Sequence, residues 1–376
     1  AQKARRIIDR LVGYKISELL RRSIQKTLSN LKKSLSAGRV QSSTVKILVD
    51  RERQRMKFKD VTYFDLKSEM LTKKDEPFSA ALFSLSDMKL ATGKDFDSTT
   101  GELKNKKVMM LSETQAQALI EELSSGPWTI IDREEKPQTS YPPPPFITST
   151  LQQAAGTKLR FSAKRTMITA QKLYENGFIT YMRTDSVQLS SEAIQSARNM
   201  IKSSFGEKYL PEKPNYYKSK VKNAQEAHEA IRPAGSAIKS AEEVERSLGK
   251  DAANLYKLIR MRTLACQMNP AKILRTIILI QNQKAIFRAM GKVIQFPGYR
   301  LAYVESQSQE KKQIDDEVLP AMEKGEELSC EKLRIESHTT KPPPRYSEAS
   351  LIKEMVTRGI GRPSTYSAII SNIQNR

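Results

Sequence analysis

The sequence predicts a multidomain α+β protein, because three features of the 376-residue chain agree. Stretches whose apolar residues recur at the helical period of about 3.6 are segregated from stretches with the two-residue period of strands. Two proline runs, at 142–145 and 342–344, fit neither a helix nor a central strand and mark connectors. The length also exceeds what one ordinary core needs and favours two to four domains.

Helices are expected at both ends of the chain and in its middle. The first spans about residues 3–30, where apolar residues recur at the helical period, and the second spans about 41–56. Residues 150–262 are mainly helical, and Ser162 is a candidate cap for one of these helices. A last helical unit covers about 347–376.

Strands are expected on both sides of the middle helical region. From Val61 the sequence changes to short alternating runs that fit strands with one buried face, and strand character returns at 273–280 and 285–293. A chain that leaves a sheet, forms helices and returns to the sheet places a helical insertion on an arch.

The net charge predicts a polyanionic partner. Lys and Arg number 64 against 42 Asp and Glu, which gives a formal charge of +22. Residues 1–40 hold eleven Lys or Arg and only two acidic residues. Nucleic acid fits this excess best, and the alternative for any single basic run is a solvated helix face.

Cysteine usage and hydropathy narrow the class of protein further. Two cysteines, Cys266 and Cys330, can build neither a disulfide framework nor a four-thiolate zinc site, a pattern typical of a reducing compartment. No stretch approaches the ~20 apolar residues that cross a bilayer, so we expect a soluble, intracellular protein without a membrane partner. The opening Ala1 and the uncapped helical pattern at Asn375–Arg376 lead us to expect a segment of a longer protein.

Tyr181 and Arg183 are candidate catalytic residues. A phenol ordinarily has a pKa of about 10, so a tyrosine attacks a phosphodiester near neutral pH only where a cation favours the phenolate or a base takes its proton. In a strand, the two-residue spacing puts both side chains on one face, where the guanidinium can hold a non-bridging phosphate oxygen. Taken alone, a tyrosine beside an arginine is more often structural.

His228 is a third candidate. It is one of only two histidines, and the other, His338, lies in a polar Ser-His-Thr-Thr run that we interpret as ordinary surface. A lone histidine is more often packed or exposed without a function, so composition alone gives His228 no role.

A second group of candidates lies on the first predicted helix: Arg5, Arg6, Asp9, Arg10 and Tyr14. Their spacing of about three to five residues lets much of the set share one face. That face is either an ordinary basic surface or a groove for single-stranded nucleic acid. In such a groove the arginines hold phosphates, the tyrosine stacks on a base and the aspartate accepts from a base amino group.

Residues from elsewhere in the chain extend this predicted groove. Arg39 and Gln41 follow the first helix and continue the same wall. Near the other end, Arg362 and Thr365 flank Pro363-Ser364, a predicted helix start whose free N–H groups suit a phosphate. Both ends of the chain therefore supply candidate DNA-binding residues.

Four segments of the sequence resemble motifs of the type IA DNA topoisomerases. Residues 177–186 (GFITYMRTDS) resemble the active-site signature, with Tyr181 as the nucleophile, and residues 223–233 (NAQEAHEAIRP) resemble the histidine motif. Residues 35–42 (LSAGRVQS) resemble the DNA-groove motif, and residues 358–366 (RGIGRPSTY) resemble the late helix-turn motif. The four separated motifs follow the family order and the resemblance spans residues 5–376, so together they are far more specific than any one of them.

The resemblance implies ATP-independent relaxation of negatively supercoiled DNA. Tyr181 would cut one strand through a 5′-phosphotyrosine link, His228 would contact the strand near the cut, and strand passage and religation would follow. Exchanging a phosphodiester for a phosphotyrosine conserves the bond type, and the sequence has no Gly-rich Lys-Ser/Thr loop for a nucleoside triphosphate. The resemblance also implies a preference for cytosine a few nucleotides upstream of the cut.

The resemblance further implies a toroid body of three domains. Residues 1–60 and 331–376 would form a mostly helical single-strand DNA-binding domain, and 61–145 with 266–330 a β arch that serves as a hinge. Residues 146–265 would form a helical cap that carries the catalytic tyrosine and swings away to pass the second strand.

Other parts of the family's architecture are expected outside this chain. Family members bind Mg²⁺ through an acidic cluster in an N-terminal Toprim lobe and often carry C-terminal zinc ribbons, and this sequence has neither. The closest acidic run, at 315–317, is expected to be solvated charge, so we expect no metal ligands here. The isolated chain should bind DNA without completing the reaction. The complete protein should be a cytoplasmic, nucleoid-associated monomer, or lie in an organellar nucleoid if eukaryotic.

Three alternatives stay open at this point. The chain could be a non-catalytic single-strand binding module that has kept the fold, or a nuclease that leaves free ends. It could also be a decatenating relative within the same family, although the match to the bacterial relaxing type favours relaxation.

Overall fold

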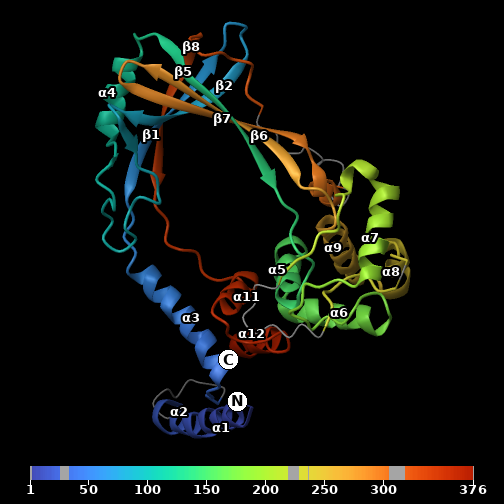
Figure 1. Cartoon of the computed structure of the whole chain (residues 1–376). Helices are drawn as coiled ribbons and strands as arrows, with labels where there is room; N and C mark the ends of the chain where they lie inside the picture. The colour runs from blue at the N-terminus through green and yellow to red at the C-terminus, as the bar shows by residue number, and fades with distance from the viewer. Residues whose placement is uncertain (1, 26–33, 219–227, 236, 305–317, 376) are drawn as a thin grey trace. The chain divides into compact units, whose positions relative to one another are not determined.

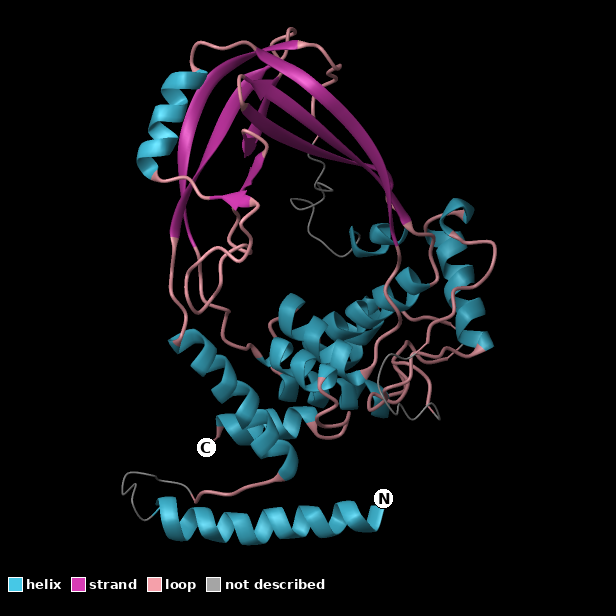
Figure 2. Cartoon of the chain, turned by 60° about the vertical axis from the view of Figure 1, so that its left-hand side comes forward, coloured by secondary structure: helices cyan, strands magenta, loops and turns pink. Residues whose placement is uncertain are grey.

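The computed structural model describes residues 2–25, 34–218, 228–235, 237–304 and 318–375, which fall into two compact units. Unit 1 comprises residues 1–52, 142–269 and 345–376, and unit 2 comprises residues 53–141 and 270–344. All described strands belong to unit 2 and most helices to unit 1 (Figures 1 and 2). The mixed α+β class predicted from the sequence is therefore confirmed.

Unit 2 is one eight-stranded sheet, mostly antiparallel, in the order β1-β8-β5-β6-β7-β2-β3-β4. β1 also pairs with β2, so six of the strands close into a ring that has no free edge between them. The strands are β1 (Thr62–Leu71), β2 (Pro77–Leu85), β3 (Met88–Leu90), β4 (Val108–Met109), β5 (Trp128–Ser140), β6 (Ala271–Asn282), β7 (Ala285–Phe296) and β8 (Glu327–Thr339).

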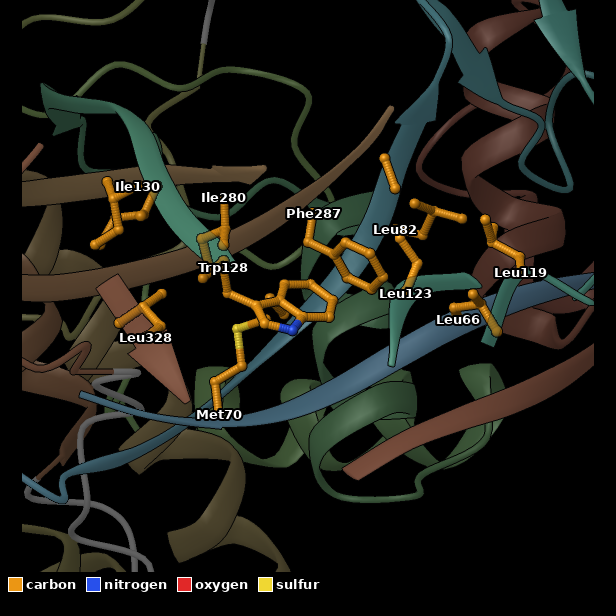
Figure 3. Packing of buried hydrophobic residues seen from close by; sticks show 14 of the residues in the cluster. Leu66, Met70, Leu82, Leu119, Leu123, Trp128, Ile130, Ile280, Phe287 and Leu328 are labelled. Atoms are coloured by element: carbon orange, nitrogen blue, oxygen red, sulfur yellow. The ribbon is translucent and has the colours of Figure 1, made fainter. Parts of the chain in front are cut away.

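The core of unit 2 lies where these strands meet α4 (Glu113–Leu123). Trp128 and Phe287 pack edge to face with ring centroids 5.0 Å apart, and Leu119 and Leu123 from α4 close the same cluster (Figure 3). A capping box at Ser112 starts α4. Two short helices, η4 (Gly298–Arg300) and α10 (Leu301–Val304), follow β7.

Unit 1 is helical. Its helices are α1 (Gln2–Leu11), the π-helical η1 (Val12–Ile16), α2 (Ser17–Leu20), the π-helical η2 (Arg21–Gln25), α3 (Arg39–Met56, ending in unit 2), α5 (Thr148–Lys158), α6 (Ala163–Glu175), α7 (Ser191–Ser204), the 3₁₀ turn η3 (Glu207–Tyr209), α8 (Ala241–Leu248), α9 (Lys250–Cys266), α11 (Glu348–Thr357) and α12 (Tyr366–Gln374). Buried side chains occupy most positions of α9, so this helix lies at the centre of its neighbours.

Segments that are far apart in sequence share a core in unit 1. Ile47 of α3 and Ala163 of α6 pack with Leu351, Ile352 and other residues of α11 and α12. The start of the chain and its last helices therefore form one body with the middle helical region, which brings all predicted site residues into unit 1.

Several local predictions can be compared with the structure. The Oγ of Ser162 accepts the N–H of Arg165 at 3.1 Å, which confirms the predicted cap. The first predicted helix is present over 2–25, and residues 26–33 lie outside the described part. The last helix begins at Tyr366 instead of Pro363-Ser364, because residues 363–365 form a turn. No described helix combines the length and the apolar character that a bilayer crossing needs. The three-domain division stays a prediction.

Candidate active site

Tyr181 and Arg183 project from the segment that connects α6 to α7. Their side chains are exposed, Tyr181 to 37%, while the intervening Met182 is buried to 1% and Thr184 to 2%. This alternation places Tyr181 and Arg183 on the same side of the segment, as the spacing predicts. The segment is not a strand, however. In the described part of the chain its β-pairing is limited to one isolated bridge, between Ile179 and Pro233.

Two aromatic rings flank the Tyr181 ring. Tyr174 lies edge-on with centroids 5.3 Å apart, and the exposed His228 lies edge-on at 5.8 Å, with the rings nearly perpendicular. Within the described residues, neither the Tyr181 hydroxyl nor the Arg183 guanidinium has a hydrogen-bond or ion-pair partner. Residues 223–227 of the histidine motif lie outside the described part.

The residues after His228 are firmly anchored. The Ala230 N–H donates to the Gln188 carbonyl and the Ile231 N–H donates to the Phe146 carbonyl, each at 2.8 Å. Glu229 accepts the Ser190 N–H at 2.6 Å and forms an ion pair of 2.7 Å with Arg232. These bonds hold His228 against the nucleophile segment from one side.

The Glu229 carboxylate carries a shifted pKa. Partial burial acts to raise the pKa, but hydrogen bonds from Ser190 and Arg232 outweigh it and lower the pKa below its ordinary value. The ionised form of Glu229 is therefore the form that the native structure stabilises.

Glu229→Gln is expected to change how stability depends on pH. Because the folded pKa lies below the unfolded value of about 4.3, Glu229 stabilises the fold above that value, and this contribution is lost as the pH falls through the folded pKa. The variant's deficit in free energy of unfolding should be largest near neutral pH and shrink below about pH 4. Urea unfolding across this range, with exposed Glu212→Gln as the control, measures it; a deficit independent of pH would contradict the assignment.

The basic N-terminal helix carries the second group of candidate residues. Arg6 and Arg10 are exposed along α1, and Tyr14, in the π-helical η1, is exposed to 73%. Arg10 and Tyr14 also line a cavity of about 460 Å³ together with Ile7, Leu11 and Lys15. Arg5 lies in α1, as predicted. An exposed aromatic ring beside arginines has the composition of a single-strand binding surface.

Asp9 and Arg39 are joined by a two-pronged ion pair. The Arg39 Nε donates to one Asp9 oxygen at 2.7 Å and a terminal nitrogen donates to the other at 3.2 Å, which links α1 to the start of α3. The hydrogen bond that Arg39 donates to Asp9 raises the pKa of Arg39. Both side chains are exposed, so the pair contributes only about 0–1 kcal/mol. Nearby, Gln41 Nε2 donates to the Ser36 carbonyl at 3.4 Å.

Arg362 and Thr365 form a closed turn before α12. The Thr365 hydroxyl accepts the Arg362 N–H at 2.8 Å and donates to the Arg362 carbonyl at 3.0 Å, while Arg362 also donates to the Gly361 carbonyl. The hydroxyl of Thr365 is therefore engaged in the turn, and its direct effect is to fix the backbone that carries Arg362. Gly361 has a φ of +82°, which a residue with a side chain rarely adopts.

Arg362 also lines a cavity of about 820 Å³ in unit 1. Among the described residues that line it, the charged ones are Lys218, Lys353 and Arg362, and all three are basic. Three tyrosines, Tyr216, Tyr217 and Tyr366, line it as well. Sequence reasoning did not select Tyr216, Lys218 or Lys353, although the run Tyr216-Tyr217-Lys218 has the interleaved aromatic and basic residues of a nucleic-acid surface.

The described residues do not fit a Mg²⁺ site. Nowhere among them do three or more His, Cys, Asp or Glu side chains come together as metal ligands. The acidic run at 315–317 lies outside the described part.

Comparison with known proteins places these features in context. A family model described as DNA topoisomerase matches residues 1–376. DNA topoisomerase 1 of Synechocystis sp. is 48% identical over 379 residues, and DNA topoisomerase 1 of Mycobacterium tuberculosis is 44% identical over 392 residues. All of this chain is covered in both, but it spans only 41% of each relative.

The structure has a similar solved counterpart. Full-length topoisomerase I from Thermotoga maritima matches the whole chain with a TM-score of 0.75 and 35% sequence identity. The match covers 56% of that protein's chain. The present chain thus corresponds to part of a longer protein in each of these relatives.

Proposed function

The chain belongs to the type IA DNA topoisomerase family, and we propose that it supplies the strand-holding and strand-cutting residues of an enzyme that relaxes negatively supercoiled DNA without ATP. Tyr181 is the nucleophile, Arg183 stabilises the charge that develops on the phosphate, and His228 contacts the strand beside the cut. Residues of α1, α3 and the turn before α12 hold the strand.

The cleavage step exchanges one phosphoester for another. The Tyr181 phenolic oxygen attacks phosphorus, the bond between phosphorus and the 3′ oxygen breaks, and the 5′ end stays on the tyrosine. The phenolic proton is released and the leaving 3′ oxygen takes up a proton, so charge balances. Religation reverses these steps after the other strand has passed, and no bond energy has to come from a nucleotide.

One observation carries this proposal. Tyr181 is partly exposed on the same side of its segment as Arg183, His228 lies edge-on to its ring, and neither the hydroxyl nor the guanidinium has a partner in the described part of the chain. A structural tyrosine would more often have its hydroxyl satisfied. An unengaged phenol beside an unengaged cation is what attack on an anionic phosphate requires.

The proposed strand-holding residues are basic, polar or aromatic: Arg5, Arg6, Asp9, Arg10, Tyr14, Arg39, Gln41, Arg362 and Thr365. The cavity lined by Lys218, Lys353 and Arg362 supports this role, because these three cations attract phosphates and the described part of its lining contains no acidic side chain. The Asp9–Arg39 pair holds the arginine in place before DNA arrives. We propose that the partner is single-stranded DNA exposed in negatively supercoiled duplex.

We propose further features for the complete enzyme. Its Mg²⁺ is held by residues outside this chain, so the isolated chain binds DNA but does not complete the reaction. The protein acts as a monomer on chromosomal DNA. Within the chain, a helical DNA-binding domain, a β arch and a helical cap move relative to one another during strand passage.

The isolated chain is expected to bind a single-stranded oligonucleotide with a strong dependence on salt. Each phosphate contact contributes about 0.7 to the slope of log K against log salt, so Arg10→Ala should reduce the magnitude of that slope by the contribution of about one contact.

Tyr14→Ala should weaken binding by about 1–3 kcal/mol and leave the slope unchanged, because stacking is not ionic. Fluorescence anisotropy at several salt concentrations measures both. Lys94→Ala, in unit 2, is the control, and equal effects of all three changes would count against the groove.

A further inference from the structure

The nucleophile segment holds its position without the hydrogen bonds of a sheet. Residues 180–184 form no strand, so their backbone groups lack a ladder of partners. In place of a ladder, the side chains of Thr148 and Thr180 form hydrogen bonds with backbone groups of this segment and of the histidine segment.

Thr180 joins the nucleophile segment to the histidine segment. Its hydroxyl donates to the Ala230 carbonyl at 2.7 Å and accepts the Arg232 N–H at 3.0 Å, and its own N–H donates to the Arg232 carbonyl at 2.9 Å. Since His228 lies two residues before Ala230, these bonds set the backbone that carries His228 against the backbone that carries Tyr181.

Thr148, in the first turn of α5, holds the other side of the segment. Its fully buried hydroxyl donates to the Met182 carbonyl at 2.7 Å and accepts the Thr184 N–H at 2.9 Å. Its own N–H donates to the Thr184 carbonyl at 2.9 Å. The two backbone residues that flank Arg183 are therefore tied to a helix that has its own core contacts with α11.

We propose that Thr148 and Thr180 are positioning residues that set the separation and direction of Tyr181, Arg183 and His228, an inference that rests on the proposed function of Tyr181. Each hydroxyl already donates its single proton to a backbone carbonyl and accepts a backbone N–H, so neither can donate a hydrogen bond to a substrate. Their contribution is to orient the nucleophile, and misplacement of reacting groups by about 1 Å lowers a rate on the order of 10²-fold.

The test uses Thr180→Val and Thr148→Val in the complete protein that contains this chain, with the two Thr→Ser variants as conservative replacements. Valine keeps the shape of threonine and removes the hydroxyl, whereas serine keeps the hydroxyl. The control is Thr263→Val, because Thr263 is as buried as Thr148, but in the described part of the chain its hydroxyl bonds within α9, to the Ile259 carbonyl at 3.0 Å. Three quantities are measured: thermal stability, affinity for a single-stranded oligonucleotide, and the rate of covalent adduct formation at saturating DNA.

Both valine variants are expected to form the adduct on the order of 10²-fold more slowly, with affinity for the oligonucleotide unchanged within about twofold. The serine variants should recover most of the rate. Thr263→Val should lose thermal stability and keep the rate of adduct formation. If Thr148 and Thr180 had a purely structural role, the rate would instead follow thermal stability in the same way in all three valine variants.

Each other outcome has a definite meaning. A stable valine variant that cleaves at the wild-type rate, or a serine variant as slow as valine, overturns the positioning role and leaves the proposed function intact. If the fully buried Thr148→Val does not fold, Thr180→Val decides, since Thr180 is only partly buried. A wild-type protein that forms no adduct overturns both the inference and the function on which it rests.

Discussion

Tyr181→Phe is expected to abolish the covalent adduct between the complete protein and single-stranded DNA, with a loss of at least about 10⁴-fold. The substitution removes the attacking oxygen and keeps the ring, so the edge contacts with Tyr174 and His228 are retained. Affinity for DNA should therefore change little. The measurement is the yield of protein linked to a labelled oligonucleotide after denaturation.

Tyr174→Phe is the matched control for this experiment. Tyr174 packs against Tyr181 and has a similar exposure, 40% against 37%, but it lies on α6. Its phenylalanine variant should form the adduct normally. Adduct formation that survives in Tyr181→Phe and disappears in Tyr174→Phe would move the nucleophile to the neighbouring ring.

Arg183→Ala is expected to slow adduct formation by about 10²–10³-fold. The guanidinium is the cation that shares a side of the segment with Tyr181, and removing one group that stabilises a developing oxyanion costs a rate of that order. The rate for Arg183→Lys should lie between those of wild type and Arg183→Ala, because lysine keeps the charge and loses the planar fork that holds two oxygens. Single-turnover kinetics at saturating oligonucleotide measure the effect apart from binding.

Arg165→Ala provides the comparison for Arg183. Arg165 is also exposed in unit 1, but its guanidinium is paired with Asp251 at 2.6 Å. The rate of adduct formation should stay within about twofold of wild type, as for most surface substitutions away from a site. An equal loss in both variants would mean that Arg183 acts through general charge and not through the phosphate at the cut.

The sequence predicts the helices and strands of this fold better than it predicts how distant elements pair and pack. Period and caps locate helices such as α3 and α6, since Ser162 and the apolar spacing act within a few residues. The pairing of β1 with β2, which closes six strands into a ring, has no local signature. The core contact of Ile47 with Leu351 likewise joins residues too far apart for a periodic pattern to reveal.

The site shows the same division. The two-residue spacing of Tyr181 and Arg183 can be read from the sequence, and in the structure both are exposed while the intervening Met182 is buried, although the segment is not the strand that the prediction assumed. The ion pair of Asp9 with Arg39 could not be predicted, because thirty residues separate them and each looked like an independent DNA contact.

Thr365 shows a second limit of sequence reasoning. Its hydroxyl forms hydrogen bonds with the Arg362 backbone in a local turn. Residue types alone do not show whether such a hydroxyl bonds the backbone or is free to bind DNA. The basic cavity around Lys353 was missed for a further reason: its lining comes from segments that meet only in the folded chain.

The most direct test of the central claim is to identify the residue that carries the DNA. The adduct formed by the complete protein is trapped by denaturation, the DNA is digested with nuclease and the protein with protease, and mass spectrometry locates the remaining nucleotide. We expect it on the peptide that contains Tyr181, linked through the 5′ phosphate. A nucleotide on any other residue, or cut DNA with two free ends and no adduct, would contradict the assignment of Tyr181 as the nucleophile.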